Sequence, residues 1–161
     1  MARSTFTLTI AGEQAPPEPY VDQVRHVAAS VNKSILPGLL DDQMNKLFVQ
    51  EGTIASGVVL DVDLSASLDR FGNALALSDA ALVYIENKNA ATGNLFVSAS
   101  ASNGWTTLLG TVANLQLKPT MSMLIQALKA GELAVSPTNG SLKLQAVGAD
   151  VDYVIHVWGR G

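Results

Sequence analysis

The stretch Val58-Val59-Leu60-Asp61-Val62-Asp63-Leu64 shows the strongest hydrophobic alternation in the chain. Its even-numbered positions are all aliphatic, and two of the three positions between them are aspartate. Because successive side chains of a strand point to opposite faces, this pattern predicts a half-buried β-strand.

The same alternation returns near the C-terminus, where Val151, Tyr153, Ile155 and Val157 would share one face of a strand that Gly159 ends. Leu142, Leu144 and Ala146 alternate before it. Further strands are expected at 47–49, 82–85, 95–99, 115–117, 121–125 and 133–135.

Segments 82–85 and 95–99 should form a hairpin across the loop between them, which is rich in Asn and Gly. Many short strands without helix–strand alternation predict an all-β fold, an antiparallel β-sandwich that is jelly-roll-like, over residues 45–161. The pattern does not separate a jelly roll from another sandwich.

Residues 1–44 read as an N-terminal strand followed by a Pro-rich arm. Phe6, Leu8 and Ile10 alternate with threonines up to Gly12, and three prolines then fall between positions 16 and 19. Segment 20–35 has helical spacing of apolar residues, yet it is rich in valine; we favour an extended arm over a short helix. The first strand would pair either with a sheet edge on a neighbouring molecule or within its own domain.

The composition favours a chain that is partly covered by other subunits. It has 161 residues, of which 48% are hydrophobic and 15% charged, against a usual ~25% charged. Mean hydropathy is +0.25. A monomer with a neutral Ser/Thr-rich surface is the alternative, and we favour an oligomer.

Other function classes find little support in the sequence. With no cysteine and a net charge of −4, the chain predicts no disulfide scaffold, no thiolate chemistry and no nucleic-acid partner. No apolar run approaches the ~20 residues of a membrane span, and the first residues do not predict a signal peptide.

The residues that could carry chemistry have structural interpretations. His26 and His156 lack a converging ligand set, although His156 could pair with Asp152 on the same strand face. The Asp61/Asp63 pair fits a solvent-facing strand better than a calcium or glycosidase site. We therefore expect no enzyme activity, no cofactor and no metal.

From residue 45 onward the chain resembles a group of small virion proteins of tailed bacteriophages, of the capsid decoration (cement) or minor structural type. The segments that carry the resemblance are NKLFVQEGTIASG (45–57), LDVDL (60–64), LDRFGN (68–73), LVYIEN (82–87) and YVIHVWG (153–159). The resemblance implies a small antiparallel β-sandwich that forms trimers or dimers on the outside of the phage head, without catalytic residues.

We accordingly expect a decoration protein on the head exterior that binds the major capsid protein and itself, as a homotrimer first and a homodimer second. Binding only to the assembled lattice would stabilise it by mass action. The residues expected at oligomer or capsid contacts are Phe6, Leu8, Ile10, Tyr20, Trp105 and Trp158.

Two other functions remain open from the sequence. The first is a tail, baseplate or fibre-associated structural module, whose sequence would look much the same. The second is a lectin-like sandwich that binds carbohydrate through Trp105 or Trp158.

Overall fold

The computed structural model describes residues 4–14, 25–35, 44–69, 73–110, 114–127 and 129–161. The chain divides into two units, Met1–Pro37 and Gly38–Gly161. The sequence had placed the boundary a little later, between residues 44 and 45.

The first unit contains a two-stranded antiparallel hairpin. Strand β1 (Ser4–Gln14) pairs along its whole length with β2 (Arg25–Ile35). The register sets Leu8 opposite Val31 and Ile10 opposite Ala29. Within residues 25–35 the chain is therefore extended, as the sequence favoured over a helix, and it is paired as a strand. β1 runs past Gly12, where the sequence had predicted its end.

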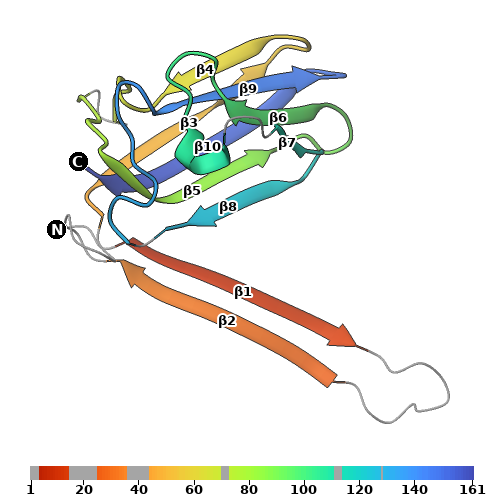
Figure 1. The fold of residues 1–161 in the computed structure, drawn as a ribbon. Coiled ribbons are helices and arrows are strands. Elements are labelled where there is room, and N and C mark those ends of the chain that lie inside the picture. Colours follow the sequence, from red (N-terminus) through yellow and green to blue (C-terminus); the bar gives the residue numbers. More distant parts are fainter. Residues whose placement is uncertain (1–3, 15–24, 36–43, 70–72, 111–113, 128) are drawn as a thin grey trace. The chain divides into compact units, whose positions relative to one another are not determined.

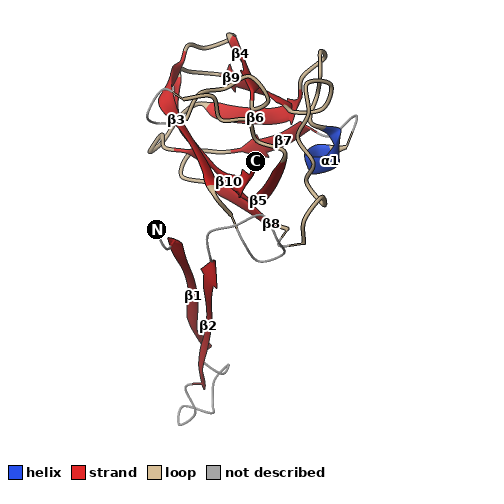
Figure 2. Ribbon diagram, turned by 90° about the vertical axis from the view of Figure 1, so that its left-hand side faces the viewer, coloured by secondary structure: helices blue, strands red, loops and turns tan. Residues whose placement is uncertain are grey.

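The second unit is a sandwich of two four-stranded sheets (Figures 1 and 2). One sheet has the order β3-β10-β5-β8, and its strands are β3 (Lys46–Ile54), β10 (Val151–Arg160), β5 (Asp79–Asn87) and β8 (Ser122–Gln126). The other has the order β4-β9-β6-β7, with β4 (Val59–Asp63), β9 (Ser141–Val147), β6 (Asn94–Ala99) and β7 (Asn114–Leu117).

The pairing of these strands is nested. β6 pairs with β7, β5 with β8, β4 with β9 and β3 with β10, all antiparallel, and β10–β5 and β9–β6 contacts complete the sheets. This is the topology of a jelly roll, in which one long hairpin is rolled into two sheets. The sequence prediction of an antiparallel, jelly-roll-like sandwich is thus confirmed.

The nesting also shows why the hairpin predicted between segments 82–85 and 95–99 is wrong. Those segments are β5 and β6, which belong to different sheets. The loop between them crosses the sandwich, anchored by Asn87, whose side-chain amide donates to the carbonyl oxygens of Gly93 (2.9 Å) and Leu117 (3.0 Å).

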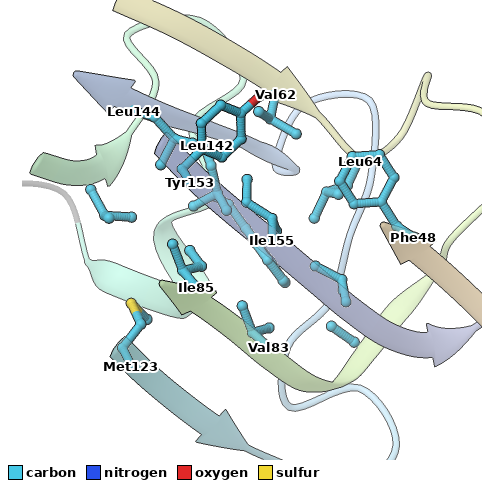
Figure 3. Packing of buried hydrophobic residues seen from close by; sticks show 14 of the residues in the cluster. Phe48, Val62, Leu64, Val83, Ile85, Met123, Leu142, Leu144, Tyr153 and Ile155 are labelled. Atoms are coloured by element: carbon cyan, nitrogen blue, oxygen red, sulfur yellow. The ribbon is translucent and has the colours of Figure 1, made fainter. Parts of the chain in front are cut away.

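A single apolar core fills the space between the sheets (Figure 3). The inward residues of β9 and β10 are those that the alternation predicted, and Leu142, Leu144 and Ile155 have no exposed surface. Each such side chain contributes about 1.5–3 kcal/mol on burial. Figure 3 labels the core residues Phe48, Val62, Leu64, Val83, Ile85, Met123, Leu142, Leu144, Tyr153 and Ile155.

β10 continues past Gly159 to Arg160, although the sequence had predicted that Gly159 would end it. The register shifts between Trp158 and Gly159, and a Cβ added to Gly159 would lie 2.1 Å from the carbonyl oxygen of Asp79. Gly159 therefore permits a close approach of two backbones. Beyond it, the guanidinium of Arg160 forms a buried ion pair with the Asp79 carboxylate.

The strand predicted at residues 133–135 is wrong: Ala134 makes an isolated bridge with Asp79. A short helix, α1 (Thr106–Leu109), for which the sequence offered no prediction, lies beside the sheets (Figure 2).

Candidate functional site

The outer face of the β3-β10-β5-β8 sheet carries apolar and aromatic side chains. The register aligns them in rows across the four strands. One row is Val49, His156, Tyr84 and Leu124; the row beside it is Leu47, Trp158, Leu82 and Gln126. We call these eight residues the aromatic face; Leu82 among them is buried, at 2% exposed.

The aromatic rings within this face contact one another. The ring centroids of Tyr84 and His156 lie 6.0 Å apart with an interplanar angle of 52°. Those of His156 and Trp158 lie 5.2 Å apart, edge to face at 76°. Both separations fall in the range of favourable aromatic pairs, so the three side chains support one another in a fixed arrangement.

Acidic groups border the aromatic face on one side. The next row contains Glu51, Val154 and Glu86, and Val154 is 8% exposed between the two carboxylates. The Tyr84 hydroxyl donates to Glu86 Oε2 at 2.7 Å, and Lys88 Nζ lies 3.6 Å from Glu51 Oε2. A partner that covers this face would therefore meet apolar surface next to hydrogen-bond acceptors.

The environment of the aromatic face shifts the pKa values of His156 and Tyr84. Burial lowers the pKa of His156 below its ordinary value of 6.5, an effect that the carboxylates of Glu51 and Glu86 partly oppose. Burial also raises the pKa of Tyr84, as does its hydrogen bond to Glu86. At neutral pH the centre of the face consequently consists of an uncharged imidazole and an uncharged phenol.

The outer face of the other sheet is polar by comparison. Asp61 lies opposite Lys143, and these residues alternate along their strands with buried Val62 and Leu142. Phe96 is half-buried there, in register with Gln145 on one side and Gln116 on the other. Val59 and Val147 are also exposed on this face, at 43% and 40%, so what distinguishes the aromatic face is its cluster of contacting rings.

Of the residues predicted at contacts, Trp158 lies on the aromatic face and is half-buried. The prediction that Trp105 lies at a contact is wrong. Its side chain has no exposed surface and belongs to the core. Its Nε1 donates to the carbonyl oxygen of Ala134 at 2.9 Å. It cannot serve as a contact or as a sugar platform while the sandwich is folded.

The four remaining residues predicted at contacts belong to the first unit of the chain. Phe6, Leu8 and Ile10 occupy alternate positions of β1, opposite Lys33, Val31 and Ala29 of β2. Tyr20 lies outside the described residues, as do the three prolines near it.

The acidic pairs take part in local hydrogen bonds. Asp63 Oδ1 accepts from the Ser65 backbone at 2.9 Å, and Asp152 Oδ1 accepts from the Thr53 hydroxyl at 2.6 Å. Within the described ranges no group of three or more His, Cys, Asp or Glu side chains is placed to hold a metal ion. Among the same residues, no helix has the length and apolar character needed to span a membrane.

Sequence reasoning missed most of the aromatic face, including Val49, Tyr84 and Leu124. A signal was present: Leu47-Phe48-Val49 and Leu82-Val83-Tyr84-Ile85 are continuous apolar runs, whereas β4 alternates with aspartate. A continuous run indicates a strand that is apolar on both faces.

Comparison of the chain with family models, with curated proteins and with solved structures finds no significant match.

Proposed function

We propose that this protein is a bacteriophage virion structural protein, a capsid decoration protein that binds and stabilises the assembled head. The observation that carries the proposal is the aromatic face, where the rings of Tyr84, His156 and Trp158 contact one another on one outer side of the sandwich. Jelly rolls are common among capsid and lectin domains, and the sequence resemblance to decoration proteins favours the first of these.

The chemistry of the aromatic face suits a protein partner. Trp and Tyr are enriched at the centres of interfaces, where their rings lose water and their polar tips find partners. The neighbouring carboxylates of Glu51 and Glu86 would accept from donor groups around an apolar patch on the major capsid protein. Many copies bound in this way would stabilise the shell by mass action.

The N-terminal hairpin is proposed as a second contact. A two-stranded hairpin is only marginally stable alone in water, so β1 and β2 would gain from pairing with a further surface. Protein that lacks residues 1–40 should bind heads more weakly than the full chain. Unchanged affinity after this deletion would remove the hairpin from the proposal.

The proposal is tested by binding full-length protein to purified heads that lack it. Trp158→Ala should weaken binding about thirtyfold, since truncating a central interface residue costs about 2 kcal/mol or more. The matched control is Phe96→Ala, which removes a half-buried ring from the outer face of the other sheet. Equal affinities of the two variants would contradict the proposal.

A carbohydrate-binding function is the second candidate, because the Trp158 ring contacts His156, and His156 and Tyr84 lie beside the row that contains Glu51 and Glu86. A glycan array would reveal it through binding that Trp158→Ala abolishes. A tail or baseplate module is distinguished from a decoration protein by its much lower copy number per particle.

A further inference from the structure

Among the described residues, β8 is an edge strand whose outer side has no strand paired to it. It lies at the end of the β3-β10-β5-β8 sheet and, among the described strands, pairs with β5 alone. Its sequence, Ser-Met-Leu-Ile-Gln, contains no charged residue and no proline, the devices that commonly protect an edge. Of the other edge strands, β3 carries Lys46 and Glu51 and β4 carries Asp61 and Asp63, whereas the shorter β7 is likewise uncharged.

The hydrogen bonds at the two ends of β8 show which of its residues bond to β5. Asn87 N donates to Met121 O at 3.0 Å, and Ala127 N donates to Ala81 O at 2.9 Å. Odd-numbered residues of β8 therefore bond to β5, and the N–H and C=O groups of Ser122, Leu124 and Gln126 point to the free edge. These three residues are also the exposed residues of the strand.

We propose that β8 pairs antiparallel with β8 of a second copy of this chain, about a two-fold axis at Leu124. Leu124 then lies opposite Leu124 of the second copy, and Ser122 lies opposite Gln126 of the second copy. Every outward backbone group of the three residues gains a partner in this register. In this register the two Leu124 side chains face each other and the Ser122 hydroxyl faces the Gln126 amide, so no like charges meet.

This contact is isologous and closes at two copies. This two-fold contact favours a homodimer over the homotrimer that the sequence had led us to expect first. Leu124 ends the row that contains Tyr84 and His156, so the pairing joins the aromatic faces of two copies into one continuous surface. The dimer itself does not depend on capsid binding, and its test requires no capsid.

The solution mass of the full chain tests the pairing. Wild-type protein should have twice the 16.9 kDa of one chain, and Leu124→Lys should have the mass of a single chain, since it sets two like charges directly opposite each other. The matched control is Val49→Lys, at the other end of the same row: Val49 is 38% exposed and Leu124 is 36% exposed. The control should stay dimeric.

Mixing Leu124→Lys with Leu124→Glu protein should restore the dimeric mass, because opposite charges then meet across the axis. A cysteine trap gives an independent readout, since the chain has no cysteine of its own. Opposed residues of a hydrogen-bonded pair lie about 5.5 Å apart between Cα atoms, within disulfide range, so Leu124→Cys should form a covalent dimer on oxidation. Val49→Cys should not.

A monomeric or trimeric wild type would overturn the proposal. So would a dimer that survives Leu124→Lys, or a Leu124→Cys protein that gives no more covalent dimer than Val49→Cys. The cysteine variants retain an uncharged side chain, so they decide the matter even if the lysine variant fails to fold.

Discussion

The side-chain amide of Asn87 offers the sharpest test of the crossover between the two sheets. It is fully buried, it donates to Gly93 O and Leu117 O, and its Oδ1 accepts from Asn89 N at 3.1 Å. Asn87→Ala leaves two buried carbonyl groups without this donor, at about 1–3 kcal/mol each. Unfolding free energy should fall by about 3–5 kcal/mol, a large share of the usual 5–15 kcal/mol.

Urea unfolding followed by tryptophan fluorescence measures this loss, with Trp105 as a buried reporter. Asn114→Ala is the matched control, since it removes an exposed asparagine at the start of β7 and should change stability by less than about 0.5 kcal/mol. Asn87→Asp should be worse still at neutral pH, because a carboxylate would face two carbonyl oxygens. If Asn87→Ala matched the Asn114→Ala control, the anchoring role of Asn87 would be refuted.

Three further predictions concern stability and are checked by the same unfolding measurements. Asp79→Asn should cost about 3 kcal/mol or more, because it breaks the buried pair with Arg160; a loss as small as that of an exposed aspartate would contradict this. His156 has a folded-state pKa below 6.5, so stability should decline as the pH falls below about 6.5, where the unfolded chain binds the proton first. His156→Gln should flatten that decline, and an unchanged slope would assign it to other groups. Thr120 has a positive φ of 64° in the turn that is closed by the hydrogen bond from Met121 N to Lys118 O. Because glycine adopts a positive φ without strain, Thr120→Gly should raise the unfolding free energy by about 0.5–1 kcal/mol. A fall in unfolding free energy would refute the strain.

Local alternation was enough to predict the sheet content and much of the core. In β9 and β10 the inward residues Leu142, Leu144, Tyr153 and Ile155 follow directly from period two, since each strand has one face in the core. The pairing of β5 with β8, and of β6 with β9, could not be predicted in this way. Nested pairing joins segments far apart in sequence, and the turn signals between β5 and β6 are equally compatible with a hairpin.

The candidate site could likewise be predicted only in part, because long-range strand pairing assembles most of it. Trp158 was predicted at a surface from its place near the end of a strand, but its cross-strand neighbours Leu47 and Leu82 are brought to it by the registers of three strands. Trp105 was misplaced because a tryptophan in a loop gives no sign, in sequence, of whether its ring turns inward. Its indole N–H finds the Ala134 carbonyl within the fold, which makes burial favourable.

We propose that the aromatic face of the sandwich binds the outside of a phage head. An electron cryo-microscopy reconstruction of heads incubated with the purified protein tests this binding most directly. We expect sandwich density on the head exterior, with Trp158 and His156 against the major capsid protein and the β4-β9-β6-β7 sheet turned to solvent. Heads without added density, or density in which the β4-β9-β6-β7 sheet faces the capsid, would contradict it.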